Sequence, residues 1–136
     1  MKGSSIIYPL CLTALLFLNS ARPVPGPDLG GVAGVDKVLH FFFFGLLATT
    51  WIRTSYFSSP RRLGWAWLLT VGIGALDEAF QSFSPYRTTD YLDLVADGLG
   101  AALAISVYHF WPTYRKILER KTLNWKAPTS TATESS

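Results

Sequence analysis

Apolar residues are concentrated in four long segments of the chain, separated by polar or proline-rich stretches. With flanking residues counted, each segment reaches roughly 18 to 22 residues, about what a helix needs to cross the hydrocarbon core of a bilayer. Backbone groups in lipid must pair within their own segment, so each segment is expected to be a helix. The pattern predicts an all-α fold, a polytopic membrane bundle of four transmembrane helices at Ile6 to Leu18, Val38 to Ile52, Leu63 to Phe80 and Leu92 to Trp111.

The polar stretches divide the chain into four regions. Residues 1–21 are the expected first transmembrane segment, although a short apolar core after Lys2 also fits a signal-like anchor cleaved near Ser20. We favour an uncleaved segment, because Asn19 fits a cleavage signal poorly. Residues 22–35, rich in Pro and Gly, predict an outer loop. Residues 36–111 are the expected three-helix core, and residues 112–136 a basic cytoplasmic tail, without an apolar period after Tyr114 and disordered at its end.

The distribution of positive charge predicts the orientation of these helices. Nine of the 12 Lys and Arg residues fall at one end of the expected bundle and three at the other. Because Lys and Arg collect on the cytoplasmic side of membrane proteins, both termini are expected in the cytoplasm. The larger group is Lys2, Arg53, Arg61, Arg62, Arg115, Lys116, Arg120, Lys121 and Lys126, and the smaller group is Arg22, Lys37 and Arg87.

Composition supports a membrane protein and excludes several other classes. The chain is 49% apolar and 15% charged, which leaves too little polar surface for a protein in water. Its basic residues lie in short groups without an aromatic-basic strip, so the expected partner is the lipid bilayer and no nucleic acid. Cys11 is the lone cysteine, which rules out a disulfide framework or a multi-cysteine metal site within one chain.

Acidic residues gather at the outer end of the last three segments. Six of the nine Asp and Glu residues lie there, and three polar pairs four residues apart share helix faces. Asp97 lies about 7.5 Å into its segment, a depth at which ionisable groups normally point into the bundle. The three polar faces are therefore expected to meet, with Lys37 and Arg87 as compensating cations. The six acids are Asp36, Asp77, Glu78, Asp90, Asp93 and Asp97, and the pairs are Asp36 with His40, Asp77 with Gln81 and Asp93 with Asp97.

A structural interpretation of these residues stays open beside a functional one. Asp36, Asp90 and Asp93 lie near helix N-termini, where an acid caps free backbone N–H groups. His40 could be a histidine satisfied by Asp36 and nothing more. Small residues of the third and fourth segments predict close packing between those two helices. These residues are Gly72, Gly74, Gly98, Gly100, Ala101, Ala102 and Ala104.

Several motifs in this region resemble the VanZ-like family. An Asp-Lys-x-x-His motif opens the second segment at Asp36, an Asp-Glu-x-x-Gln motif closes the third at Asp77, and Arg87 precedes Asp93 by six residues. Together, in this order, they form a specific signature over residues 36–104. The chain departs from the family pattern at Asp97, where members commonly have Asn, at Tyr86, where Gly often precedes the Arg, and at Phe43 and Phe44, where an aromatic residue with a hydroxyl is frequent.

The resemblance implies a small multi-pass protein of the bacterial cytoplasmic membrane. The family is named for a member that confers low-level resistance to the glycopeptide antibiotic teicoplanin. Carried over by position, the polar motif residues are Asp36, Lys37, His40, Asp77, Glu78, Gln81, Arg87 and Asp93. These are residues that the topology had already grouped.

Three functions remain open from the sequence. The first is an outward-facing polar site that binds an envelope-related ligand, either a lipid-linked cell-wall precursor or a glycopeptide antibiotic, and that could contribute to resistance. The ligand-binding candidates are Lys37, Gln81, Arg87, Asp93 and Asp97. The second is a membrane-embedded enzyme, with His40 as a base oriented by Asp36, or with Asp77 and Glu78 as an acid/base pair around a divalent cation. The third is a scaffold or assembly subunit. No recognised metal motif, cofactor motif or Ser or Cys nucleophile motif appears.

Overall fold

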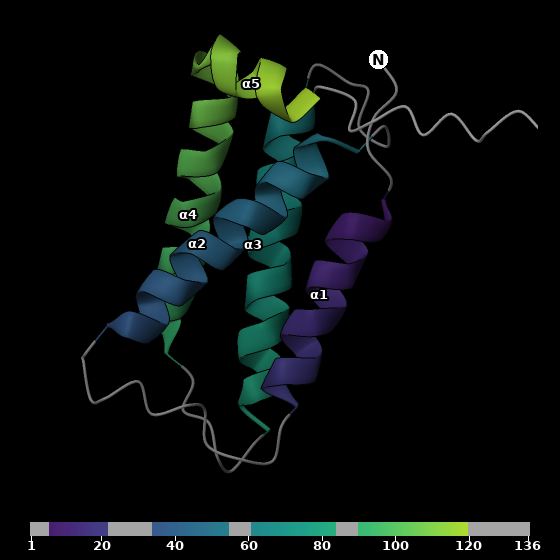
Figure 1. Ribbon diagram of the computed structural model, residues 1–136. Helices are drawn as coiled ribbons and strands as arrows, with labels where there is room; N and C mark the ends of the chain where they lie inside the picture. The colour runs from purple at the N-terminus through teal and green to yellow at the C-terminus, as the bar shows by residue number, and fades with distance from the viewer. Residues whose placement is uncertain (1–5, 22–33, 55–60, 84–89, 120–136) are drawn as a thin grey trace, which may run out of the picture.

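The computed structural model describes residues 6–21, 34–54, 61–83 and 90–119, and its regular elements there are helices. Four long helices run alternately up and down, and a short fifth helix folds across the end of the fourth (Figure 1). This confirms the all-α fold. The helices are α1 (Ile7–Ser20), α2 (Val35–Ile52), α3 (Arg62–Gln81), α4 (Tyr91–Phe110) and α5 (Pro112–Glu119). Arg87, most of the expected outer loop and the expected disordered end of the tail lie outside the described residues.

The starts of α2 and α4 follow from local chemistry. Asp90 is the N-cap of α4, and its side chain accepts a hydrogen bond of 2.9 Å from the backbone N–H of Leu92. This is the capping role expected of an acid at a helix start. Gly34 precedes α2 with a φ of 92°, a left-handed conformation that glycine adopts without strain. Asp36 does not cap α2 but lies in its first turn, where its charge meets the positive end of the helix dipole.

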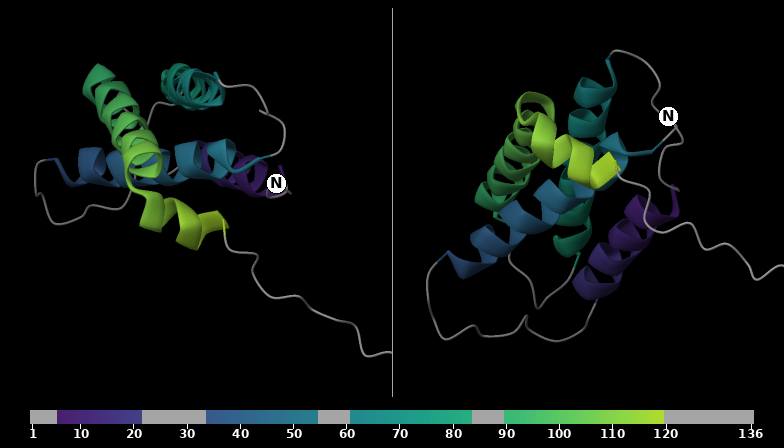
Figure 2. Two further views of the ribbon diagram at one scale, coloured as in Figure 1. Left: turned by 90° about the horizontal axis from the view of Figure 1, so that it is seen from above. Right: turned by 45° about the horizontal axis from the view of Figure 1, so that its top comes forward.

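The closest approach between helices joins α2 and α4, which make the most extensive interface of the bundle. Figure 2 shows α4 crossing α2 obliquely. At the crossing, a Cβ added to Gly100 would collide with the backbone carbonyl of Phe41, and one added to Gly45 would lie 3.1 Å from the carbonyl oxygen of Gly100. The expectation that Gly100 packs against the third segment was therefore wrong, because that glycine faces α2. Gly72, also expected in that interface, has nothing within 4 Å of the place that a Cβ would occupy, whereas Gly74 does pack between α3 and α4.

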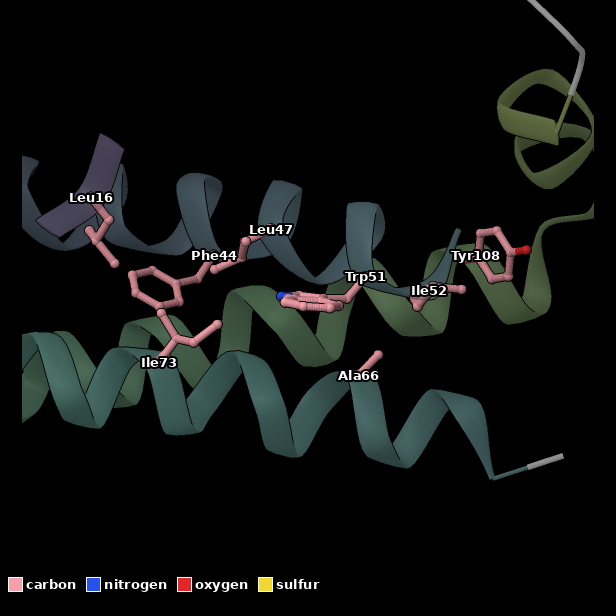
Figure 3. Packing of buried hydrophobic residues seen from close by; sticks show 8 residues of the cluster. All are labelled: Leu16, Phe44, Leu47, Trp51, Ile52, Ala66, Ile73 and Tyr108. Carbon is pink, nitrogen blue, oxygen red and sulfur yellow. The ribbon is translucent and has the colours of Figure 1, made fainter. Parts of the chain in front are cut away.

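The interior combines an apolar cluster with buried acids. The cluster lies between the helices and contains Leu16, Phe44, Leu47, Trp51, Ile52, Ala66, Ile73 and Tyr108 (Figure 3). Asp77 and Asp97 are also buried, each with 1% of its surface exposed. In contrast, large apolar side chains are exposed along every long helix, as at Leu15, Phe42 and Leu68. A surface of this kind suits lipid, and buried acids in lipid-embedded bundles normally point inward.

Length and composition identify two helices that are able to cross a membrane. These are α2, with 18 residues, and α4, with 20 residues. At helical rise they are about 27 and 30 Å long, close to the thickness of the hydrocarbon core. Helix α1 is apolar but shorter, with 14 residues, and α3 carries Arg62, Asp77, Glu78 and Gln81 within its 20 residues. The sequence-based count of four transmembrane helices therefore exceeds what these criteria establish.

The region after Trp111 contains a helix that the sequence pattern did not predict. Helix α5 extends to Glu119, beyond Tyr114, where no apolar period was expected. Tyr114 and Leu118, four residues apart, pack against the apolar cluster, and the buried Tyr108 donates a hydrogen bond to Glu119. Two apolar residues on one helix face are too few to show a period in the sequence, but they hold α5 to the bundle.

The crossing of α2 and α4 predicts a position-specific effect of methyl groups. Gly100→Ala forces the helices apart and should lower the free energy of unfolding by about 1–3 kcal/mol, the usual cost of overpacking. Gly72→Ala, with open space around it, should leave stability unchanged or slightly raised, because alanine favours helix. Thermal unfolding of the purified protein in detergent measures both. Equal destabilisation by the two variants would contradict the close approach.

Candidate functional site

One end of the bundle brings together polar side chains from four helices. The C-terminal ends of α1 and α3 and the N-terminal ends of α2 and α4 lie at the same end of the molecule (Figure 1). The hydrogen bonds found there join α1 to α3, α2 to α4, and the start of α4 to α3. We call this region the polar end. It contains Ser20, Asp36, Lys37, His40, Asp77, Glu78, Gln81, Asp90, Asp93 and Asp97.

Lys37 of α2 is the centre of an ion-pair network that holds α2 to α4. Its Nζ lies 2.7 Å from Oδ2 of Asp90, 3.2 Å from Oδ1 of Asp93 and 3.1 Å from Oδ2 of Asp36. The hydrogen bond from the Lys37 ammonium holds the pKa of Asp90 below its usual value. One ammonium group is therefore shared among three carboxylates, so the network remains negatively charged.

His40 forms an ion-pair-like contact with the buried acid of α4. Its Nδ1 lies 2.9 Å from Oδ1 of Asp97, and 21% of the His40 side chain is exposed against 1% of the Asp97 side chain. The hypothesis that Asp36 orients His40 was wrong, because Asp36 instead contacts Lys37 and is 58% exposed. Asp36 and His40 share a helix face. The crossing of α2 and α4, however, brings Asp97 against the imidazole ring in place of Asp36.

Asp77 of α3 is held by a buried network that includes α1. Its Oδ1 accepts a hydrogen bond of 2.6 Å from the Ser20 hydroxyl, and its Oδ2 accepts one of 2.8 Å from the Gln81 amide. The same amide nitrogen lies 3.3 Å from the Ser20 oxygen. The expected pair of Asp77 and Gln81 is therefore in contact, whereas the sequence did not indicate Ser20. The signal that could have found it was a hydroxyl at the end of the first segment, at the same depth as the acids.

Glu78 of α3 and Asp97 of α4 each have a carboxylate oxygen that no described group satisfies. Glu78 accepts a hydrogen bond of 3.2 Å from the backbone N–H of Asp90 through Oε2, but its Oε1 is buried without a partner. Asp97 likewise engages His40 through Oδ1 and leaves Oδ2 buried without one. A buried acceptor that lacks a hydrogen-bond donor is costly. Oδ2 of Asp97 lies against Gly74, so Oε1 of Glu78 is the oxygen at which a donor group would be stabilised.

The polar end is rich in hydrogen-bond acceptors and poor in donors. Across the described ranges it holds six carboxylates against one lysine, whose ammonium is engaged by three of them. Within those same ranges, no three His, Cys, Asp or Glu side chains are grouped as metal ligands would be. The chemistry of this end therefore favours groups that donate hydrogen bonds or carry positive charge.

A bundle with an apolar surface, two helices able to cross a membrane and buried acids at one end is typical of an integral membrane protein. The chain belongs to the VanZ/LLP1 family, whose model matches residues 5–112. This confirms the family resemblance and extends it over α1.

A curated relative is an uncharacterised protein of the fission yeast Schizosaccharomyces pombe. It is 39% identical over 103 residues, which cover 73% of this chain and 57% of that protein. The matched region of this chain thus spans little more than half the length of its relative. No solved structure matches the chain. Because a eukaryotic protein matches, family membership does not by itself place the chain in a bacterial membrane.

The contact between α1 and α3 predicts a specific cost of removing the Ser20 hydroxyl. Ser20→Ala leaves Oδ1 of the buried Asp77 without its donor and should destabilise the fold by about 1–3 kcal/mol. Ser106→Ala is the matched control, since the exposed Ser106 hydroxyl bonds only the carbonyl of Ala102 on its own helix. Thermal unfolding in detergent compares the variants. A Ser20→Ala protein as stable as the control would show that α1 does not contribute to this network.

Proposed function

We propose that this protein is a four-span membrane protein whose polar end faces away from the cytoplasm and binds the polar headgroup of a membrane or cell-envelope lipid. The alternating directions of α1 to α4 support four crossings, because α1 and α3 pack beside two helices that are long and apolar enough to span. Exposed apolar side chains on α1 and α3, such as Leu15 and Leu76, support lipid contact for those helices too.

The charge at the two ends of the bundle supports the orientation. The end opposite the polar end carries Arg53, Arg61, Arg62, Arg115 and Lys116, whereas Lys37 is the cation that the described residues contribute to the polar end. Positive charge collects on the cytoplasmic side of membrane proteins. Both termini are therefore proposed to be cytoplasmic, and the polar end lies at the opposite surface, where headgroups of the outer leaflet would reach it.

The observation that carries the binding proposal is the unsatisfied Oε1 of Glu78. In a scaffold that only held helices together, carboxylates with every oxygen hydrogen-bonded would give the greatest stability, because a buried polar network with unsatisfied groups is destabilising. The acceptors at this end instead exceed the donors. The unpaired Oε1 of Glu78, at an end where His40 and Asp36 are partly exposed, supports a site completed by an external donor.

Finer versions of this proposal name the ligand as a lipid-linked cell-wall precursor or a glycopeptide antibiotic, with a role in resistance. Both rest on the family resemblance alone. The enzyme alternative needs His40 as a base with Asp97, and not Asp36, as its partner. The scaffold alternative predicts variants that change stability and leave ligand binding untouched.

The topology is tested by cysteine accessibility in a Cys11→Ser background. Ser82→Cys, exposed just beyond α3, should react with a membrane-impermeant maleimide in intact cells, and Lys116→Cys in α5 should react only after permeabilisation. Four crossings place these two positions on opposite sides. Gly64→Cys, exposed in the first turn of α3, separates four crossings from two. Four crossings keep it protected until permeabilisation, whereas if only α2 and α4 crossed, both ends of α3 would lie on one side and Gly64→Cys would react together with Ser82→Cys in intact cells.

Headgroup binding is tested by native mass spectrometry of the full chain purified in mild detergent with a polar-lipid extract of the host membrane. Glu78→Gln should retain about tenfold less lipid than the wild type, the change expected when one charge-assisted hydrogen bond is weakened. Glu119→Gln, an acid at the opposite end, is the matched control and should retain lipid as the wild type does. Equal lipid retention by all three proteins would reject the proposal in favour of a scaffold.

A further inference from the structure

Helix α5 lies at the end of the bundle opposite the polar end, directly after α4. Trp111 alone separates the two helices, and α4 is one of the two helices that are long and apolar enough to cross a membrane. With α4 in the membrane, α5 begins at the membrane surface. Seen from above, α5 lies on the side of α2 away from α3 (Figure 2). It is therefore at the rim of the bundle, where lipid adjoins the protein.

Contacts on one face of α5 hold it in this position. Tyr114 and Leu118 pack against the apolar cluster, and Glu119 accepts a hydrogen bond from the hydroxyl of the buried Tyr108. These contacts tie both ends of the short helix to the bundle. The remaining surface of α5 is therefore presented at a fixed place beside the membrane.

This remaining surface combines apolar side chains with basic ones. Phe110, Trp111 and Ile117 each have more than half of their surface exposed. Lys116 is exposed as well, and Arg115 is partly exposed. Helices that carry apolar and basic residues together lie in the headgroup region of a bilayer, and tryptophan is enriched at that depth. The composition of the surface therefore fits the boundary between headgroups and acyl chains.

Positive charge exceeds negative charge at this end of the molecule. Glu119 is the acid that the described ranges contribute there, against five cations named above for the same end. The Arg62 guanidinium lies 5.8 Å from the centre of the Tyr108 ring, and the charge of Arg115 acts on the same tyrosine. Cations from α3 and α5 therefore converge beside a single described carboxylate. Groups of four or more Lys and Arg residues next to a membrane-crossing helix attract anionic headgroups.

We infer that α5 is an interfacial helix that binds the phosphate groups of anionic phospholipids through Arg115 and Lys116, with Trp111 and Ile117 at the boundary with the acyl chains. A bilayer meets both the charge and the apolar side chains, whereas a nucleic acid would match the charge and leave Trp111 and Ile117 in water. This surface lies at the end opposite the proposed ligand site. It is present with either two or four crossings, because α4 crosses in both arrangements.

The test measures which lipid lies beside α5 in a bilayer. Thr113→Cys, exposed one turn before Ile117, carries a small fluorophore in the full chain with Cys11→Ser. The protein is reconstituted in phosphatidylcholine with a minor component of phosphatidylglycerol or phosphatidylcholine, each bearing the same nitroxide on its acyl chain. The nitroxide phosphatidylglycerol should quench the fluorophore at about tenfold lower concentration. High salt should reduce this preference, because at about 1 M the screening length falls to about 3 Å.

Variants separate the charge of α5 from its apolar contacts. Arg115→Gln with Lys116→Gln removes both charges and should make the two lipids quench equally, whereas Arg115→Lys with Lys116→Arg keeps both charges and should retain the preference. Ile117→Ser should weaken quenching by both lipids, because an apolar contact with the acyl boundary is lost. The same fluorophore on Ser82→Cys, exposed at the polar end, is the matched control and should show no preference for phosphatidylglycerol.

Three outcomes would contradict the inference. Equal quenching of the label at position 113 by the two lipids in the otherwise unchanged chain, at both low and high salt, would overturn the binding of anionic lipid. A preference that persists after Arg115→Gln with Lys116→Gln would overturn the roles of these two residues. Weak quenching by both lipids, together with a dimer of the purified chain that Ile117→Ser dissociates, would assign the surface to a second copy of this chain.

Discussion

The structure depends on the close approach of α2 and α4 at Gly100. With no side chain at that position, the backbone of α4 lies directly on the carbonyl of Phe41, and Gly45 extends the contact along α2. Lipid supplies little hydrophobic force between helices, so close backbone packing of this kind is a main source of their association. The same approach brings Lys37 to Asp90 and Asp93, and His40 to Asp97. A wider crossing would separate every one of these pairs.

The balance of charge at the polar end is a physical constraint on its role. Asp77 has both carboxylate oxygens hydrogen-bonded by Ser20 and Gln81, as a structural buried acid should. Glu78 and Asp97 do not, although Asp97 is equally buried. The polar end therefore contains two kinds of acid within a few residues. One kind holds α1 to α3, and the other has an oxygen without a hydrogen-bond donor among the described residues.

The chain belongs to the VanZ/LLP1 family, and its fission yeast relative is itself an uncharacterised protein. A shared fold does not specify a shared ligand, because function is decided by the groups at the site. Asp97 illustrates this point. It is one of the positions at which the chain departs from the pattern of the family it resembles, and it is also the residue that contacts His40. An acid at this position adds a negative charge to the polar end that an Asn would not carry.

The sequence by itself determined the four long helices and the acidic residues of the polar end. In lipid, the backbone groups of a long apolar segment form hydrogen bonds within their own helix. Acids four residues apart in a helix share one of its faces. The partner of each side chain was decided only by the tertiary structure. The sequence indicated Asp36 as the partner of His40, and the crossing at Gly100 brought Asp97 to it instead. Ser20 and α5 were missed for the same reason: one hydroxyl, or two apolar residues on a short helix, acquire a role only when a distant helix packs against them.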